Sequence, residues 1–310
     1  MSTIDPELAP AFKRLPATHT SRRTVRLMRT VTPLVLRRMN KTISMDGLSV
    51  ETVPTPGSTK DMKVYRRIDS APGAPVLLWI HGGGYVIGTN ANEQRWAVPM
   101  IDAMDCVVVA AGYRLAPEHP YPGAIDDLSA AAAWIVEHGP ARGMDPSRMV
   151  VGGESAGGGL AAALVQKLHD DGVAIRGQLL ACPMLDDRTA TRTDIEPKEH
   201  MVWSNASNSY GWSSYLGAAP GSASVGDYAV PARREDLSGL PPAWIGVGDI
   251  DLFHDENVAY AERLRAAGVA CELLIGEGGP HGYQGLVPEA EISRQFMGSA
   301  VAFTTGALAA

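Results

Sequence analysis

The chain has 310 residues, of which 45% are hydrophobic, 20% charged and 6% aromatic. This composition excludes disordered, collagen-like and coiled-coil proteins, and it provides enough apolar residues for a large buried core. The net charge of −7, from 27 basic and 34 acidic residues, argues against nucleic acid as the main partner.

The sequence also lacks the usual signals for a membrane or secreted protein. It has no run of about 18 consecutive apolar residues, so no stable membrane insertion is expected. The first seven residues lack the basic start and apolar run of a secretory signal. Three cysteines, Cys106, Cys182 and Cys271, have neither the spacing of a zinc site nor that of a disulfide framework. We therefore expect reduced, mostly buried thiols in a cytoplasmic protein.

The N-terminal segment 1–45 is unusually basic. Residues 8–45 contain nine Lys or Arg and no Asp or Glu, which leaves a balance of −16 for the rest of the chain. Apolar residues at Val25, Met28, Val35 and Met39 have helical spacing, and Pro33 interrupts them, which predicts two short amphipathic helices. A transit segment or a membrane-surface helix could have the same composition. We favour a helical cap on the acidic body, because opposite charges attract.

From residue 48 onward, strand-like and helix-like segments alternate, which predicts an α/β fold with an eight-stranded, mostly parallel sheet and helices on both faces. The expected strands are 48–54, 63–68, 76–81, 107–111, 149–154, 178–182, 243–248 and 270–275. The expected helices are 91–104, 123–138, 156–170, 255–267 and 289–305. The first two strands are expected to form an antiparallel hairpin at one edge.

Residues 186–228 break this alternation. A structureless loop of that length is uncommon, so a helical insertion is expected there. Its aromatic residues, among them Trp203, Tyr210 and Trp212, either line a substrate pocket or form the core of the insertion itself. The predicted organisation is therefore one catalytic domain over 46–310, in which the insertion and the segment 1–45 form a cap.

An apolar run at 149–152 leads into the pentapeptide GESAG at 153–157 and then into an Ala-rich helical segment. A strand, a G-x-S-x-G turn and a helix make the nucleophile elbow, in which glycines permit the sharp turn that exposes the serine. The pentapeptide alone is a weak signal, but its flanking segments make it a strong one. Ser155 is the candidate nucleophile.

The segment IHGGGY at 80–85 follows another buried strand. Consecutive glycines allow backbone N–H groups to turn toward an incoming oxygen, as in an oxyanion hole. An ordinary Gly-rich turn would be the simpler interpretation if the elbow were absent. With both motifs present, we favour the oxyanion hole.

A serine hydroxyl needs a base, and the base needs an orienting carboxylate. Four histidines follow the elbow in the chain, namely His169, His200, His254 and His281. Of these, His281 lies in a Gly-rich loop directly after the last expected strand, where catalytic side chains are commonly presented. The acid is expected among the four carboxylates that follow the strand 243–248, which are Asp249, Asp251, Asp255 and Glu256.

In combination, these motifs resemble those of the α/β-hydrolases of the hormone-sensitive lipase type, in particular the bacterial carboxylesterase branch. The resemblance covers residues 48–305 and rests on HGGG at 81–84, YRLAPEHPYP at 113–122 and GESAGG at 153–158. Glu154 precedes the serine where the family usually has Asp. The final His-Gly pair of the family matches His281 and Gly282. The resemblance implies an α/β-hydrolase fold with a helical cap.

The family's Asp-Pro-Leu-x-Asp-Glu segment aligns with residues 251–256, where Leu252 and Phe253 replace Pro and Leu. This alignment selects Asp251 as the acid. The chain order Ser155, Asp251, His281 is the order that this fold uses. Asp255 is expected to cap the following helix.

Together, resemblance and chemistry predict a serine carboxylesterase that acts on short- to medium-chain acyl or aryl esters without a metal or another cofactor. Ser155 attacks the ester, His281 carries the proton and Asp251 orients the histidine. The predicted oxyanion donors are the N–H groups of Gly83, Gly84 and Ala156. The predicted pocket residues are Tyr85, Trp203, Tyr210 and Trp212. Arg114 and Glu118 are expected to form a buried structural pair.

Four other functions remain as alternatives. A small-molecule receptor on the same fold would lack the catalytic histidine, whereas His281 is present. A metallohydrolase could use Asp249, Asp251, His254 and Asp255, but this spacing is cramped and leaves Ser155 unexplained. A lipase or an amidase is less favoured than a carboxylesterase, because nothing in the sequence indicates a large apolar face at the opening of the site.

The last expected strand also suggests an assembly. In the family's strand order it forms the terminal edge of the sheet, and Leu273, Leu274 and Ile275 follow one another there. An uncovered edge of this kind carries unpaired backbone groups. We therefore expect a homodimer in which two such edges pair about a twofold axis, although the C-terminal helix could cover the edge instead.

Overall fold

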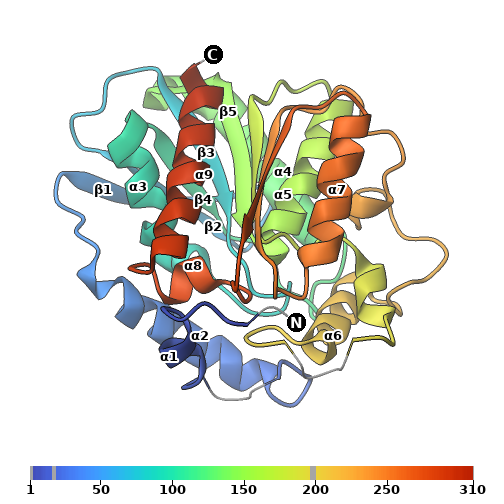
Figure 1. Cartoon of the computed structure of the whole chain (residues 1–310). Helices are drawn as coiled ribbons and strands as arrows, with labels where there is room; N and C mark the ends of the chain where they lie inside the picture. The colour runs from blue at the N-terminus through green and yellow to red at the C-terminus, as the bar shows by residue number, and fades with distance from the viewer. Residues whose placement is uncertain (1–2, 16–18, 196–199, 310) are drawn as a thin grey trace.

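The computed structural model describes residues 3–15, 19–195 and 200–309 (Figure 1). Its strands form one sheet in the order β1-β2-β4-β3-β5-β6-β7-β8. The strands are β1 (Leu48–Pro54), β2 (Asp61–Arg67), β3 (Ala74–Ile80), β4 (Val107–Ala111), β5 (Met144–Glu154), β6 (Gly177–Ala181), β7 (Ala243–Gly248) and β8 (Cys271–Gly276). The β1–β2 and β2–β4 pairs are antiparallel and the other pairs are parallel, which confirms the predicted sheet and its antiparallel edge.

Helices cover both faces of the sheet (Figure 1). They are α1 (Ala9–Phe12), α2 (Val25–Met39), α3 (Gln94–Met104), α4 (Gly123–His138), α5 (Ala156–Asp170), α6 (Asn205–Leu216), α7 (His254–Ala266), α8 (Tyr283–Leu286) and α9 (Glu291–Ala309). One core cluster joins the sheet to α4, α5 and α7, and a second joins its other face to α3 and α9. Strands β3 and β4 are buried at every position because apolar side chains meet both clusters.

Helices α2 and α6 lie across the end of the sheet at which the parallel strands finish (Figure 1). Helix α2 runs through Pro33 without a break, so the predicted interruption at this residue is wrong. A mid-helix proline removes one backbone donor, but here the helix continues on both sides of it. Met28 and Met39 are partly buried as the periodicity predicts, whereas Val35 is exposed.

Hydrogen bonds join the N-terminal segment to the segment of the expected insertion. The backbone N–H of Thr20 donates to Ser207 Oγ at 3.0 Å, and His19 Nδ1 lies 2.9 Å from Ser204 Oγ. At the other end of the insertion, the buried Asp187 pairs with Arg233 at 2.8 Å. Within the two ranges expected to form the cap, residues 1–2, 16–18 and 196–199 lie outside the described residues.

The predicted pair between Arg114 and Glu118 is wrong. Arg114 binds the buried Asp127 at 2.9 Å, and Glu118 binds Arg29 of α2 at 2.8 Å. The sequence places Glu118 only four residues from Arg114, but tertiary packing brings each of them to a partner that is more distant in the sequence, 13 residues away for Arg114 and 89 for Glu118.

Strand β8 forms the terminal edge of the sheet, as expected. Its Ile275 is 41% exposed, whereas Leu273 and Leu274 are partly buried against the two core clusters. Helix α9 packs on a face of the sheet and not along this edge (Figure 1). In the described part of the chain, no helix has both the length and the apolar character needed to cross a membrane.

Candidate active site

Ser155 occupies a sharp turn between β5 and α5. Its φ of 57° and ψ of −121° are unusual for a residue other than glycine, and the glycines beside it make room for the turn. A Cβ on Gly153 would lie 2.3 Å from the carbonyl oxygen of Gly157, and a Cβ on Gly157 would lie 2.2 Å from that of Ile80. The elbow geometry predicted from the pentapeptide is therefore present, with glycines where side chains would collide.

A continuous chain of hydrogen bonds runs from Ser155 through His281 to Asp251. Ser155 Oγ lies 2.9 Å from His281 Nε2, and His281 Nδ1 lies 2.8 Å from Asp251 Oδ2. The other carboxylate oxygen of Asp251 accepts the backbone N–H of Phe253 at 2.9 Å. The three side chains come from three separate loops at one end of the sheet, and all of them are buried.

The surroundings of His281 raise its affinity for a proton. Burial opposes the charge on His281, but the adjacent Asp251 carboxylate and the Cys182 side chain together outweigh it and hold the pKa of His281 well above its usual value of 6.5. An imidazole with this environment accepts a proton readily, which is the property that a general base for a serine hydroxyl requires.

The glycine loop after β3 packs against the elbow. A Cβ on Gly82 would lie 3.3 Å from Ser155 Cβ, and Gly83 and Gly84 have positive φ values of 120° and 56°. The backbone N–H groups of Gly83, Gly84 and Ala156 donate no hydrogen bond to any other described residue. They are free to bind an oxygen atom beside Ser155.

His81 supports this loop from behind. Its Nδ1 lies 2.8 Å from the carbonyl oxygen of Gly82, and its ring stacks on Tyr113 at a centroid distance of 4.3 Å. Burial lowers the pKa of His81 to about 4, so its imidazole is neutral near pH 7. His81 therefore shapes the loop as an uncharged group.

The other carboxylates that follow β7 have different partners. Asp249 accepts the backbone N–H of Gly278 at 2.6 Å, and Asp255 pairs with Arg192 at 2.6 Å. Asp255 lies in the first turn of α7 without capping it, since the N-cap position belongs to Phe253, which has no side-chain cap. The expectation that Asp255 caps this helix is wrong.

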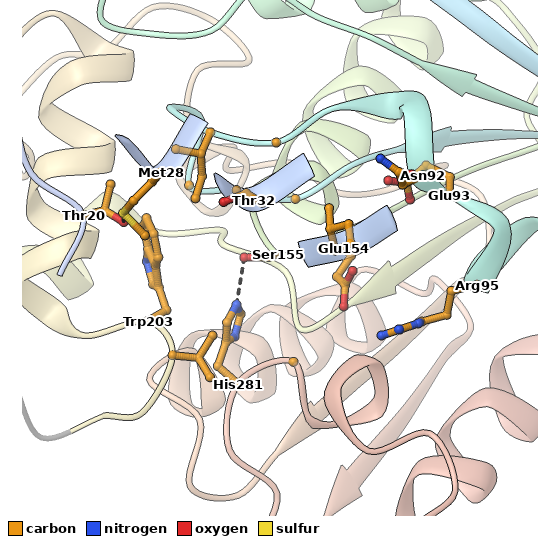
Figure 2. Close-up of a pocket in the computed structure, with 18 of the residues that line it drawn as sticks. Thr20, Met28, Thr32, Asn92, Glu93, Arg95, Glu154, Ser155, Trp203 and His281 are labelled. Atoms are coloured by element: carbon orange, nitrogen blue, oxygen red, sulfur yellow. Dashed lines mark hydrogen bonds between the residues drawn. The ribbon is translucent and has the colours of Figure 1, made fainter. Parts of the chain in front are cut away.

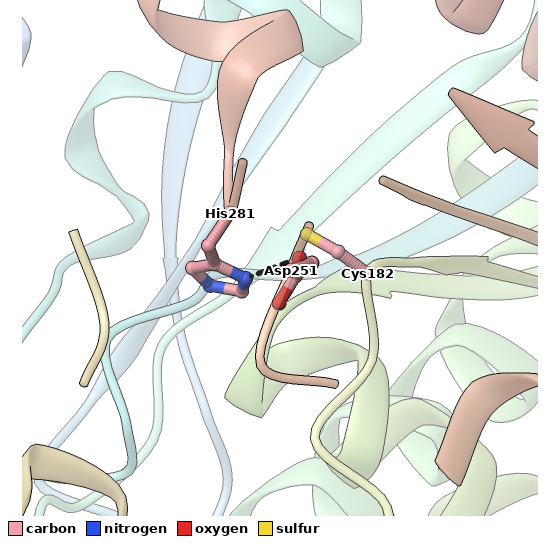
Figure 3. Close-up of side chains that lie close together, drawn as sticks. All are labelled: Cys182, Asp251 and His281. Atoms are coloured by element: carbon pink, nitrogen blue, oxygen red, sulfur yellow. Dashed lines mark hydrogen bonds and ion pairs between the residues drawn. The ribbon is translucent and has the colours of Figure 1, made fainter. Parts of the chain in front are cut away.

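One group of metal-ligand side chains occurs among the described residues: Cys182, Asp251 and His281, with atoms within 4.8 Å of one another (Figure 3). The two ring nitrogens of His281 already face Asp251 and Ser155. The four residues of the metallohydrolase alternative do not form such a group in the part of the chain described. Asp251 and His281 therefore belong to the hydrogen-bonded chain that ends at Ser155. Cys182 lies beside them as a neutral thiol, because burial raises its pKa.

A cavity of about 280 Å³ opens beside Ser155 and His281 (Figure 2). Met28 and Trp203 lie on one side of the serine, whereas Glu93 and Arg95 lie on the other. Of the predicted pocket residues, Trp203 lines this cavity. None of Tyr85, Tyr210 and Trp212 lines the part of it that the structure describes.

These three aromatic residues pack elsewhere. Tyr85 stacks on Tyr215 at a centroid distance of 4.2 Å, and its hydroxyl donates to the carbonyl oxygen of Met184 at 3.1 Å. Trp212 lies 5.1 Å from the Tyr85 ring, and Tyr210 is partly buried against the same core cluster. They join α6 to the glycine loop.

Sequence reasoning missed the polar side of the cavity. Glu93 accepts Trp79 Nε1 at 2.8 Å, and Glu154 accepts Gln284 Nε2 at 2.7 Å. Burial raises the pKa of Glu93 to about 8 and raises that of Glu154 as well, although Arg95 beside them opposes both shifts. The position of Glu154 in the elbow is the one signal that could have located this group.

Comparison with known proteins agrees with this geometry. A family model for the α/β-hydrolase fold matches residues 77–285. The chain is 38% identical over 226 residues to the esterase LipI of Mycobacterium tuberculosis, covering 70% of this chain and 69% of that protein. It is 33% identical over 297 residues to the carboxylesterase NlhH of the same species, covering 90% and 88%. The solved structure of a bacterial heroin esterase superposes with a TM-score of 0.92 at 36% identity, covering 99% and 98%.

The fold and the matches together define an α/β hydrolase, and the chain belongs to this family. The predicted resemblance to the hormone-sensitive lipase type is confirmed, and the chain is a carboxylic ester hydrolase. The alternative of a non-catalytic receptor is not favoured.

Proposed function

We propose that Ser155 is the nucleophile, His281 the general base and acid, and Asp251 the orienting carboxylate of this esterase. The observation that carries the proposal is the hydrogen-bonded chain of 2.9 and 2.8 Å that ends at a serine beside three unengaged N–H groups. The serine oxygen bonds to the ester carbonyl carbon while its proton passes to His281 Nε2. Asp251 keeps the Nδ1 proton in place and stabilises the imidazolium that forms.

The negative charge that develops on the carbonyl oxygen is proposed to be held by the N–H groups of Gly83, Gly84 and Ala156. His281 then returns its proton to the departing alcohol oxygen, which leaves an acyl group on Ser155. In the second half of the reaction, His281 takes a proton from water and the hydroxyl oxygen attacks the acyl carbon. The bond from the acyl carbon to Ser155 Oγ then breaks, His281 returns the proton to Oγ, and the carboxylic acid departs. These steps balance without a cofactor.

The size of the cavity supports a preference for short- to medium-chain acyl esters or aryl esters. About 280 Å³ lies just below the usual range of roughly 300–1,000 Å³ for ligand pockets. Met28 and Trp203 provide an apolar wall for one part of the substrate. Glu93 and Arg95 make the opposite wall polar (Figure 2).

The test is a series of initial rates on aryl esters of increasing acyl length, with Ser155→Ala measured in parallel. The rate should pass through a maximum at a short or medium chain and fall for long chains. The Ser155→Ala variant should lose about 10⁴ to 10⁶ in turnover. Wild-type hydrolysis by Ser155→Ala would contradict the assignment of the nucleophile, and a preference for the longest chain would contradict the assignment of substrate class.

We also propose that the segments 1–45 and 186–228 form a cap over this site, that the protein is a homodimer and that it is cytoplasmic. The cap is supported by the bonds from His19 and Thr20 to Ser204 and Ser207. A dimer through β8 is supported by its terminal position and by the exposed Ile275. A cytoplasmic location is compatible with the three free cysteines.

Sedimentation tests the proposed dimer. The wild type should be dimeric and Ile275→Lys monomeric, whereas a monomeric wild type would contradict the proposal.

A further inference from the structure

Exposed apolar side chains are unevenly distributed over the described part of the chain. Eleven large hydrophobic side chains are exposed in the described part of the chain, and seven of them lie in only two places, the N-terminal segment and the loop at 201–202. The seven are Leu15, Leu27, Val31, Leu34, Val35, Met201 and Val202. Single exposed apolar residues are normal on a soluble protein, but a gathered set marks an interaction surface.

Four of these residues form a stripe along the outer face of α2. Leu27, Val31, Leu34 and Val35 have the spacing of one helical face, and they are 67%, 44%, 63% and 48% exposed. The adjacent face of the same helix presents Met28, Thr32 and Leu36 to the cavity. Val202, which also lines the cavity, is 46% exposed, so α2 and the loop at 201–202 both line the cavity and both carry exposed apolar side chains.

Helix α2 and the turn just before it carry arginines that have no acidic partner among the described residues. Arg22, Arg23, Arg26, Arg37 and Arg38 are all exposed, and within the described residues none lies within ion-pair distance of a carboxylate. Among the described residues, Arg29 is the one arginine of α2 that has such a partner, Glu118. The remainder of the protein is acidic, yet none of these five arginines pairs with a carboxylate in the described ranges 3–15, 19–195 and 200–309.

We propose that the outer face of α2 is a docking surface for an anionic lipid bilayer. An amphipathic helix with an apolar stripe and flanking arginines lies in the plane of such a surface, where leucines enter the boundary with the acyl chains and arginines contact anionic headgroups. A nucleic acid would use the arginines but would leave the apolar stripe in water. Bound in this way, the cavity opening faces the lipid, so esters dissolved in the bilayer have direct access to Ser155.

Binding to vesicles tests this surface. The full-length protein is centrifuged with vesicles of phosphatidylglycerol and phosphatidylcholine in equal parts, and with vesicles of phosphatidylcholine alone, at low and at physiological salt. We expect binding to the anionic vesicles only, weakened by salt because the headgroup attraction is screened. Ser155→Ala should bind like the wild type, so this test and the test of the catalytic assignment fail separately.

Variants separate the two components of the surface. Leu27→Asp/Leu34→Asp should lower the partition coefficient at least tenfold, and Arg22→Gln/Arg23→Gln/Arg26→Gln should lower it by about fivefold for each charge removed. The matched control Ile68→Asp/Val136→Asp changes two residues that are 74% and 44% exposed outside the proposed surface. It should bind more tightly than Leu27→Asp/Leu34→Asp. Hydrolysis of a water-soluble short-chain ester without vesicles should be unchanged in all of these variants, which also shows that they fold.

Three results would overturn the proposal. The first is absence of wild-type binding to anionic vesicles at low salt. The second is binding that depends on the arginines but not on Leu27 and Leu34, which would indicate a polyanion as the partner. The third is a wild-type dimer that Leu27→Asp/Leu34→Asp converts to a monomer, which would show that a second copy of the chain covers the stripe.

Discussion

The indole ring of Trp203 lies directly against the α-carbon of Gly84. A Cβ built on Gly84 would be 2.0 Å from the indole Cη2, and Gly84 has a φ of +56°. The contact joins the segment before α6 to the loop that carries two of the proposed oxyanion donors. The position of this loop therefore depends on a residue of the proposed cap, 119 residues away along the chain (203 − 84).

Replacing Gly84 by alanine should damage both stability and hydrolysis. The methyl group must displace the indole ring, and together with the backbone strain this should cost about 2–4 kcal/mol of unfolding free energy. In a Trp203→Ala background the same replacement should cost about 1 kcal/mol, because only the strain remains. The measurements are denaturant unfolding and kcat/KM of the wild type, Gly84→Ala, Trp203→Ala and the double variant. They compare the cost of Gly84→Ala with and without the indole ring.

Gly298→Ala is a suitable control, since no atom lies within 4 Å of the added Cβ and the position is helical. It should be neutral or slightly stabilising. An equal cost of Gly84→Ala in both backgrounds would show that the indole does not determine the position of the loop.

Asp251→Asn should reduce kcat/KM more than Asp249→Asn or Asp255→Asn does. Of these three aspartates, Asp251 is the one that contacts the His281 ring, at 2.8 Å, and its carboxylate fixes the tautomer that accepts the serine proton. The loss should be on the order of 10² to 10⁴, while the other two variants should stay within a few-fold of the wild type. If Asp255→Asn, with its fold intact, proved the most damaging, the acid would have been misassigned.

Activity should fall as the pH decreases through the pKa of His281, and this pKa should lie above 6.5. The base must be neutral to accept the serine proton, so the protonated form that dominates below its pKa is inactive. Asp251→Asn removes the charge that raises this pKa, so the inflection of its residual activity should move to lower pH. Profiles of kcat/KM against pH, with Asp249→Asn as control, test this. An inflection that stays in place in Asp251→Asn would contradict it.

Arg29 should anchor α2 to the body of the protein. It donates to the carbonyl oxygens of Val86 and Ala116, each at 2.7 Å, and it pairs with Glu118 at 2.8 Å. Arg29→Met should destabilise the protein by about 1–3 kcal/mol and make α2 more sensitive to limited proteolysis. Arg26→Met, an exposed position on the same helix, should change neither property. Equal behaviour of the two variants would refute the anchoring role.

The sequence predicts the sheet well because its signals are local. The strand predicted at 107–111 and the helix predicted at 123–138 agree with β4 and α4 at both ends. An apolar run buried on both faces and an Ala-rich amphipathic segment each indicate their structure without knowledge of any neighbour. The elbow around Ser155 was recognisable for the same reason, since its glycines and its serine lie within one turn.

Features that depend on distant partners were not predictable in this way. Glu118 meets Arg29 across 89 residues, and Gln284 meets Glu154 across 130. No local pattern indicates either pair, because the contact exists only once the loops at the end of the sheet have been brought together. The continuous helix through Pro33 also depends on tertiary contacts. A proline inside a helix tends to interrupt it, and the packing of α2 on the body of the protein compensates for this tendency.

The most direct test of the account is to label the wild-type protein with a fluorophosphonate, which reacts with activated serines, and to locate the label by mass spectrometry while hydrolysis of an aryl ester is followed. The account predicts that the label lies on Ser155, that activity disappears in proportion to labelling, and that neither Ser155→Ala nor His281→Ala is labelled at the wild-type rate. Full labelling of a residue other than Ser155, or full activity of a protein labelled at Ser155, would contradict it.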